Sequence, residues 1–304
     1  MSISSSVIVC TRNRPNDIIN FLDSLEKQTT KPNEIIIVDS SDNALYKNSH
    51  FLENFSPEKF PKIKLIYKHT KPGSAYQRNV GIKVATSEIS YFFDDDAILA
   101  KDYIKKMNLI FEQKPQYAAG MGDIENIPPK QQNLTEVLRK IFMLQRIYSS
   151  GKFTWSGMPT HPYGTKKFKN IEVLSTCLMG CRTKILKKNM FDETLTGYAY
   201  MEDCDLSRRI SYKYPVFYLP EAKIKHMESP KSRDKIEENR AMFIKNYSYL
   251  FFKNFYPKNR LKIFAYLWSI MGLFVQALIY RNKAHLKGYV KGLKNFLYNK
   301  TSIK

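Results

Sequence analysis

The sequence predicts an α/β protein with a mostly parallel central sheet, followed by a basic, aromatic helical region in the last quarter of the chain. Three observations support this prediction. Short apolar runs alternate with segments of helical periodicity over the first 111 residues, polar residues follow several of these runs, and most of the positive charge lies late in the chain. Strands that alternate with helices favour parallel pairing, with both faces of the sheet covered.

The N-terminal elements follow from their apolar pattern. Runs rich in Val, Ile, Tyr and Phe predict strands, and apolar residues three and four apart predict helices. Pro15 followed by Asn16 and Asp17 marks the start of the first helix. The expected strands are 6–10, 34–39, 63–67 and 89–93, and the expected helices are 15–25, 75–85 and 103–111.

The middle of the chain is less regular. Residues 123–170 are rich in Pro, Gln and Asn, which predicts loops around one helix near 134–148. Order is expected to return at 171–182, followed by a helix at 204–213, short strands at 216–219 and 223–226, and helices from Arg233 to the end.

Composition excludes several classes of protein. A hydrophobic content of 43% and a charged content of 25% over 304 residues are ordinary for a globular chain. The start, MSISSSVIVC, lacks the basic segment and cleavage site of a secretory signal, so a cytoplasmic location is expected. Cys177 and Cys181 lack a second Cys/His pair with zinc-ligand spacing, so the four cysteines are expected to be reduced and packed.

The charge is unevenly distributed. The net charge is +21, and after residue 205 there are 21 Lys and Arg against 5 Asp and Glu. Such an excess suits a polyanion, either nucleic acid or an anionic membrane surface. No nucleic-acid reader motif accompanies it, so no nucleic-acid partner is expected.

Residues 261–280 are apolar enough and long enough to cross a bilayer. Basic residues flank both ends and Lys262 and Gln276 interrupt the run, which favours helices lying in the interface of the cytoplasmic membrane. A helix packed on the rest of the protein, with a solvated basic tail, is the alternative.

Polar residues follow three of the predicted strands: Thr11 and Arg12, Asp39, and the run Asp94–Asp96. In parallel sheets the ligand crevice lies outside the carboxyl ends of the strands, so these residues should meet in one crevice. Adjacent carboxylates suit Mg²⁺ or Mn²⁺ held together with substrate phosphates, although a solvated turn can also contain several aspartates.

A second acidic cluster contains Glu202, Asp203 and Asp205, at the junction of a loop and a helix. Acidic residues in the first turn of a helix complement its dipole and cap its free N–H groups. One of the three could instead serve as a general base.

Together these segments resemble the inverting family 2 glycosyltransferases, which have the GT-A fold and use nucleotide-diphosphate sugars. The resemblance covers about residues 5–230. It rests on the order and spacing of five elements: Ser6-Val-Ile-Val-Cys-Thr-Arg-Asn-Arg-Pro15, Ile35-Ile-Ile-Val-Asp-Ser-Ser-Asp42, Gly73-Ser-Ala-Tyr-Gln-Arg-Asn-Val-Gly-Ile82, Asp94–Asp96, and Tyr200-Met-Glu-Asp-Cys-Asp-Leu206.

The resemblance implies roles for residues around the nucleotide. Thr11 and Arg12 would lie beside the base, and Asp39 would hydrogen-bond it. Arg78 would lie near the base and diphosphate, where its planar fork suits phosphate oxygens. Gly180 would correspond to a turn near the sugar and acceptor.

The resemblance also divides the acidic residues. Asp94 would face the ribose and Asp96 would ligate the metal, while Asp95 is grouped with the nucleotide-binding residues only through its place in the triplet. His226 matches a position that supplies a further metal ligand in some relatives, and Asp203 matches the catalytic base.

The expected protein is therefore an inverting, Mn²⁺- or Mg²⁺-dependent glycosyltransferase. It would move a sugar from a UDP or dTDP donor to a hydroxyl of a glycan or lipid-linked glycan in cell-envelope polysaccharide synthesis, as a peripheral protein on the inner face of the membrane. A GT-A catalytic domain is expected at 1–230, with nucleotide-sugar-binding and acceptor-binding halves at 1–122 and 123–230, and a basic helical region at 231–304.

Two alternatives stay open. One is a nucleotidyltransferase on a similar fold, although the segment Thr11–Pro15 lacks the glycines of its usual phosphate loop. The other is a non-catalytic protein that binds polyanions or membranes.

Overall fold

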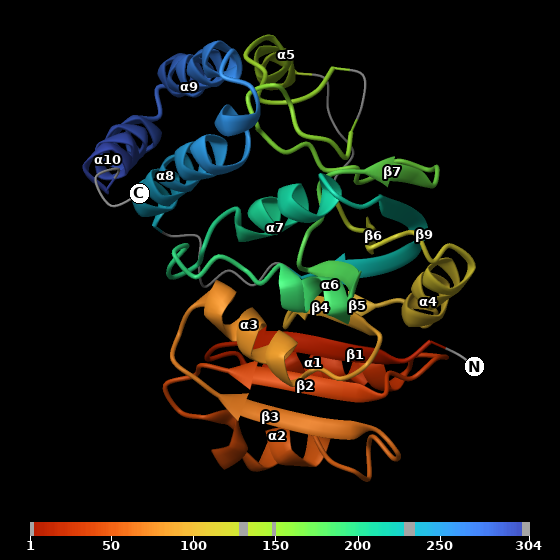
Figure 1. Cartoon of the computed structure of the whole chain (residues 1–304). Coiled ribbons are helices and arrows are strands. Elements are labelled where there is room, and N and C mark those ends of the chain that lie inside the picture. The colour runs from red at the N-terminus through yellow and green to blue at the C-terminus, as the bar shows by residue number, and fades with distance from the viewer. Residues whose placement is uncertain (1–2, 128–132, 148–149, 228–234, 300–304) are drawn as a thin grey trace.

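The computed structural model describes residues 3–127, 133–147, 150–227 and 235–299. These residues form one mixed sheet of nine strands with helices on both faces, and a group of C-terminal helices stands at one end of the molecule, far from β3 (Figure 1).

The N-terminal half of the sheet is parallel. Its strands run in the order β3-β2-β1-β4, and every pairing within it is parallel. Each residue of β2 is buried, which is expected for a strand covered on both faces. The four predicted strands are confirmed as β1 (Ser5–Thr11), β2 (Glu34–Asp39), β3 (Lys64–His69) and β4 (Ile89–Asp94).

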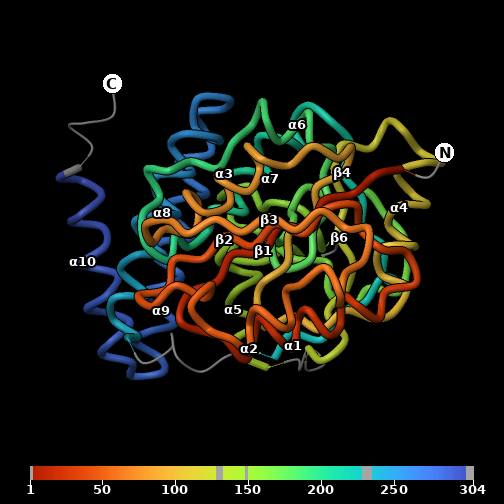
Figure 2. Tube along the Cα trace, turned by 90° about the horizontal axis from the view of Figure 1, so that it is seen from below, coloured from red at the N-terminus to blue at the C-terminus, as the bar shows by residue number. Residues whose placement is uncertain are grey.

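Helices cover both faces of this half. Figure 2 shows α1 and α2 on one side of β1–β3 and α3 on the other. Pro15 begins α1, as predicted, because a proline in the first turn removes no intrahelical hydrogen bond. The helices are α1 (Pro15–Glu26), α2 (Ser49–Asn54), α3 (Ser74–Val84) and α4 (Tyr103–Gln113); α2 and the 3-10 turn Leu45–Lys47 before it were not predicted.

The second half of the sheet is mixed. The order continues from β4 as β8-β6-β9-β5, and β8 runs antiparallel to both of its neighbours. β6 was not predicted from the sequence, because two of its six residues are glycines. Gly120 leaves room for the ring of Phe217, since a Cβ there would lie 2.3 Å from that ring. The strands are β5 (Ala97–Leu99), β6 (Ala119–Ile124), β7 (Lys169–Ile171), β8 (Leu178–Arg182) and β9 (Val216–His226).

Two expectations for this half are corrected. The two short strands are one, β9, because residues 219–222 stay extended while the register against β6 shifts between Met121 and Asp123. Gly180 lies within β8 rather than in a turn; a Cβ there would lie 2.5 Å from the ring of Tyr91.

The helices after β6 follow the predicted order with different limits. α5 (Leu134–Ile141) ends earlier than expected, and Tyr148 lies outside the described residues. The stretch 171–182 divides between the end of β7 and β8. α6 (Thr183–Lys188) was not predicted, and α7 (Glu202–Ser211) begins two residues before the expected helix.

The C-terminal region is helical, as predicted, although Arg233 lies outside the described residues. It contains α8 (Ile236–Asn254), the 3-10 turn Tyr256–Lys258, α9 (Lys262–Ile279) and α10 (Lys283–Asn299). α10 packs closely on α8 because Gly288 and Gly292 bring the two backbones together. Among the described helices, α9 alone has the length and apolar composition to cross a membrane, and about a third of it is buried.

Candidate active site

A cleft of about 1300 Å³ opens at the carboxyl ends of β1 and β4. Its walls come from the ends of these strands, from the start of α3, from the loop before α7 and from the end of β9. The position agrees with the crevice expected for parallel strands.

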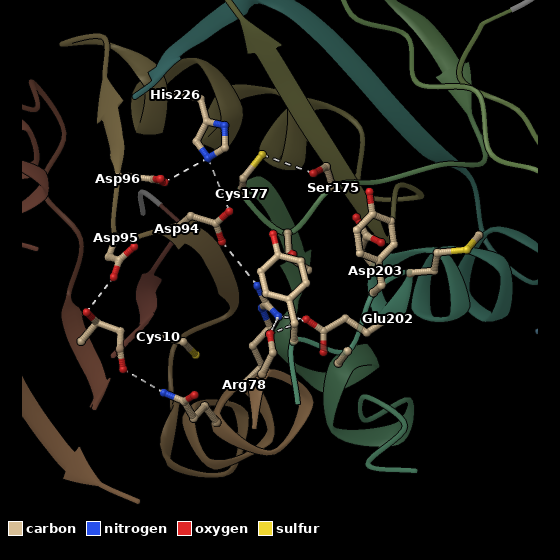
Figure 3. Close-up of a pocket in the computed structure, with 18 of the residues that line it drawn as sticks. Cys10, Arg78, Asp94, Asp95, Asp96, Ser175, Cys177, Glu202, Asp203 and His226 are labelled. Atoms are coloured by element: carbon tan, nitrogen blue, oxygen red, sulfur yellow. Dashed lines mark hydrogen bonds and ion pairs between the residues drawn. The ribbon is translucent and has the colours of Figure 1, made fainter. Parts of the chain in front are cut away.

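Two aspartates and one histidine meet on one side of this cleft (Figure 3). Asp94 is the last residue of β4, and Asp96 follows two residues later. Antiparallel pairing of β5 with β9 aligns Ala97 with His226, which brings the imidazole to the aspartates. His226 Nε2 lies 3.0 Å from Asp96 Oδ1 and 3.7 Å from Asp94 Oδ2.

These three residues could hold a metal ion. One ligand atom from each lies within 4.8 Å of the others. Two carboxylates and an imidazole provide hard oxygen donors with one nitrogen donor, a set compatible with Mn²⁺. Burial raises the pKa of Asp94, and the nearby Arg78 guanidinium opposes that rise. A cation at this position would likewise favour the ionised carboxylate.

Asp95 points away from this group. Its Oδ2 accepts a hydrogen bond from the Thr11 hydroxyl at 2.7 Å, and its Oδ1 lies 3.0 Å from Arg14 Nη1. Burial raises the pKa of Asp95 to about 7, although Arg14 acts in the opposite direction. Asp95 therefore ties the acidic turn to the end of β1, and it lines the cleft beside its two neighbours without joining the group around His226.

Arg78 of α3 connects the triad to the opposite wall. Its guanidinium lies 3.4 Å from Asp94 and forms an ion pair with Glu202, the first residue of α7. Ser74 donates a hydrogen bond of 2.6 Å to the same Glu202 carboxylate. The arginine is 8% exposed, so this cation is fixed at the edge of the cleft.

The three carboxylates of α7 have different surroundings. Glu202 and Asp203 both line the cleft. Glu202 is buried against Arg78, whereas Asp203 is partly exposed and accepts the N–H of Cys204 at 2.8 Å. Asp205 is fully buried away from the cleft, 2.8 Å from Arg209 and 2.9 Å from Lys253. Asp203 alone among them combines a place in the cleft wall with partial exposure, the condition for meeting a substrate hydroxyl.

Most of the predicted nucleotide-binding residues also line this cleft, including Thr11 and Arg12. Arg12 is exposed and lies 3.3 Å from Asp42. Asp39 lies outside the described lining; its buried carboxylate accepts hydrogen bonds from the N–H groups of Ser41 and Leu45 and from the Tyr67 hydroxyl. A direct bond from Asp39 to a base would require one of these partners to move.

Two residues belong to the site in ways that the sequence did not predict. Arg14, which was assigned no role, lies 3.0 Å from Asp95 and 3.8 Å from Asp96, and Glu202, considered only as a helix-capping residue or a base, pairs with Arg78. Arg14 is part of the motif that ends β1, so its position beside the acidic turn could have been suggested. The Glu202 partnership depends on contact between α3 and α7, which no local pattern shows.

The mixed sheet and the helices around it form the GT-A fold of nucleotide-sugar transferases. A mannosyltransferase from Pyrobaculum calidifontis, solved with GDP-Man and Mn²⁺, superposes with a TM-score of 0.60 at 16% identity, covering 99% of this chain and 88% of that one. TarS 1–349 of S. aureus, solved with UDP-GlcNAc, gives a TM-score of 0.59 at 16% identity over 97% of this chain and 80% of that one. At these identities the likeness establishes the fold.

The chain belongs to glycosyl transferase family 2, because residues 6–190 match the sequence model of that family. It is 28% identical over 231 residues to the amylovoran biosynthesis glycosyltransferase AmsB of Erwinia amylovora, which covers 72% of this chain and 68% of AmsB. In a longer TarS structure the match spans 39% of the TarS chain. The protein is thus a glycosyltransferase, and the nucleotidyltransferase and non-enzymatic alternatives are not favoured.

Proposed function

We propose that this protein is a metal-dependent, inverting glycosyltransferase that moves a sugar from a nucleotide-diphosphate donor to a hydroxyl of a glycan or lipid-linked glycan in cell-envelope polysaccharide synthesis. One observation carries the proposal: the group Asp94, Asp96 and His226 shares a cleft with the partly exposed carboxylate of Asp203. The proposed site for the donor's diphosphate and the proposed base for the acceptor would thus border the same cleft.

Asp96 and His226 would hold the cation, with Asp94 completing the protein ligands or facing the ribose. A bound Mn²⁺ or Mg²⁺ would neutralise the charge that develops on the leaving diphosphate. Arg78 adds a fixed positive charge at the same edge of the cleft, where it can contact phosphate oxygens.

Asp203 would accept the proton of the acceptor hydroxyl as that oxygen attacks the anomeric carbon. The attack comes from the face opposite the leaving diphosphate, so one displacement inverts the anomeric configuration. The proton moves to an Asp203 carboxylate oxygen, and the bond between the sugar and the diphosphate breaks. Thr11 and Arg12 line the cleft on the side where the nucleoside is expected.

A uridine or thymidine donor is favoured by the sequence resemblance. The solved relatives that share the fold include complexes with UDP-GlcNAc and with GDP-Man, so the fold accommodates more than one base. The similarity to AmsB, a glycosyltransferase of amylovoran biosynthesis, supports a biosynthetic role for this chain. We also propose residues 1–230 as the catalytic domain, with the helices that follow as its membrane-facing part.

The site proposal is tested by ligand-dependent thermal stabilisation. Ligand at one hundred times its Kd adds about 2.7 kcal/mol, or about 5 °C in Tm for a chain of this length. We expect UDP with Mn²⁺ to raise the Tm of the wild type, and the effect to disappear with EDTA. Asp96→Ala and His226→Ala should lose most of this shift and most of the turnover of a nucleotide-sugar panel.

Glu221→Gln is the matched control, since it removes an exposed carboxylate from the same strand as His226. It should keep the full shift. A metal-dependent shift of normal size in Asp96→Ala would refute the metal site. If the wild type turns over none of the UDP, dTDP and GDP sugars, the proposed reaction is refuted.

Membrane association is supported by an apolar face formed by α5 and α9. The helices contact each other through the Trp268 indole N–H, which donates to the Ile141 carbonyl at 2.8 Å. The outer residues of this face are between 41% and 70% exposed: Leu134, Val137, Ile141, Phe264, Leu267, Trp268, Met271, Leu278 and Ile279. Exposed lysines at helical spacing on α10 (Lys283, Lys287, Lys291 and Lys294) would add attraction to anionic lipid.

Flotation with vesicles tests this association. We expect the protein to float with vesicles of 30% phosphatidylglycerol more than with neutral phosphatidylcholine, and less at high salt. Phe264→Ser with Met271→Ser should reduce the bound fraction severalfold. Leu52→Ser with Leu109→Ser, at residues 47% and 48% exposed on α2 and α4, is the matched control. Equal flotation of both double variants would refute the proposed face.

A further inference from the structure

The loop before α7 carries two exposed tyrosines into the cleft. Tyr198 and Tyr200 both belong to its lining and are 62% and 38% exposed. Their ring centroids lie 5.9 Å apart, with the planes inclined by 46°. Large aromatic side chains exposed beside a polar catalytic cleft need an explanation, since exposure of apolar ring faces to water is unfavourable.

The backbone of this loop is unusual. Gly197, Ala199 and Met201 all have positive φ, at 70°, 49° and 70°. Left-handed conformations are uncommon and strained for residues other than glycine, and they persist where the surrounding structure holds them, often at binding sites. Two of the three residues that flank the tyrosines are not glycine, so the backbone that holds both rings in the cleft is strained.

Neighbouring helices fix the loop at both ends. The Ser74 N–H at the start of α3 donates to the Gly197 carbonyl at 3.2 Å. The side-chain amide of Asn246, on α8, donates to the Tyr200 carbonyl at 2.8 Å. The Tyr200 ring packs edge-on against Phe243, also on α8, at 5.7 Å. The aromatic surface is therefore a preformed part of the site, and it extends from the loop to the C-terminal helices.

We propose that Tyr198 and Tyr200 form a platform on which a pyranose ring of the carbohydrate acceptor stacks. A pyranose has an apolar face of C–H groups with hydroxyls around its edge, so it suits an aromatic surface bordered by polar side chains. The proposal rests on the proposed function, because it assigns the acceptor's sugar to the same cleft.

The position of the platform favours the acceptor over the donor. Nucleoside and diphosphate are assigned to the side of Thr11, Asp94 and Asp96. Tyr198 borders that side, within electrostatic range of Asp94, and the platform continues through Tyr200 toward Phe243 and α8. Asp203 follows Tyr200 by three residues and lines the same cleft. A sugar on the platform would thus present a hydroxyl near the carboxylate assigned to accept its proton.

Saturation-transfer NMR tests the platform directly. The probes are the methyl pyranosides of glucose, galactose, mannose, N-acetylglucosamine and N-acetylgalactosamine, each added to the full chain with UDP and Mn²⁺. We expect ring-proton signals from at least one probe, and an affinity about ten-fold lower in Tyr198→Ala or Tyr200→Ala. Tyr200→Phe should retain binding, because it keeps the ring face.

Tyr212→Ala and Tyr214→Ala are matched controls. These tyrosines are 56% and 38% exposed and lie outside the cleft lining, so both variants should bind the probe as the wild type does. Nucleotide affinity is measured in the same samples for UDP and, where UDP does not bind, for dTDP and GDP. If the wild type binds none of the three, the proposed function fails.

If UDP binds but no pyranoside does, or if the tyrosine variants bind the probe normally, the platform is wrong and the proposed function stands. A fall in UDP affinity in the tyrosine variants, with pyranoside binding unchanged, would assign the rings to the donor and would also overturn the proposal.

Discussion

Replacing Asp203 and Asp205 in turn, each by asparagine, should separate catalysis from stability within a single helix. Asp203 is partly exposed in the cleft, and its visible structural contact is the N–H of Cys204. An asparagine there can accept the same bond through its amide oxygen. We therefore expect Asp203→Asn to keep its Tm and to lose about 10²–10⁴-fold in turnover, the usual contribution of a general base.

Asp205→Asn should behave in the opposite way. Its carboxylate has no exposed surface, and both oxygens are used: Oδ2 by Arg209, and Oδ1 by Lys253 and the Asn254 amide. Replacing the charged carboxylate by a neutral amide removes the anionic partner that Arg209 and Lys253, both partly buried, share at this position. Breaking a buried ion pair from one side costs about 3–5 kcal/mol. Because the asparagine oxygen can retain one hydrogen bond, we expect the lower end, or about 6 °C in Tm.

The assay pairs thermal melting with turnover per folded molecule, at a temperature where both variants are folded. Asp205→Asn should keep turnover within a few-fold of the wild type. If Asp205→Asn abolishes turnover at full stability while Asp203→Asn stays active, the assignment of the base is wrong by two positions. If both variants melt like the wild type, the account of Asp205 is wrong.

Three further predictions concern stability. Burial raises the pKa of Glu34, but hydrogen bonds to its carboxylate outweigh that effect and hold the pKa at about 2. The ionised side chain therefore stabilises the fold at pH values above its unfolded pKa near 4.5. Glu34→Gln should lower the free energy of unfolding in urea by about 3 kcal/mol at pH 7, and by progressively less as the pH falls from 5 toward 2. Gly292→Ala would place a Cβ 2.2 Å from the Ala241 carbonyl oxygen, so it should lower Tm by forcing α10 away from α8, whereas the same change in an exposed helix is stabilising. Ala199 has a φ of 49°, so Ala199→Gly should leave Tm nearly unchanged, whereas Ala199→Val should lower the free energy of unfolding by about 2 kcal/mol. If the two variants melt at the same temperature, the backbone at this position is not strained.

Much of the fold could be predicted from local sequence pattern, because the parallel half of the sheet has continuous apolar strands between amphipathic helices. β5 and β6 could not be predicted in this way. β5 has three residues, and β6 owes its place to glycines that admit the Phe217 ring and the backbone of β9. Such strands are defined by their neighbours, which the sequence around them does not show.

The site was predictable to the extent that it lies at strand ends. Asp94 and Asp96 follow from the end of β4, yet the sequence gives no reason for Asp95 to turn the other way; that depends on Thr11 and Arg14 across the sheet. His226 reaches the aspartates only through the register of β5 against β9. For Asp39 the structure adds what the motif could not show, namely that its buried carboxylate already accepts hydrogen bonds from Ser41, Leu45 and Tyr67.

The order of strands in the sheet has a consequence for synthesis. β5 pairs with β9, which follows it by more than a hundred residues, so this edge of the sheet cannot close while the chain is still short. N-terminal segments emerge and fold first. A nascent chain that ends just after Asp96 therefore carries Asp94 and Asp96 without His226, Asp203 or Asp205. With the roles proposed for His226 and Asp203, catalytic competence would be acquired late in translation, and a prematurely terminated chain would hold the aspartates without these residues.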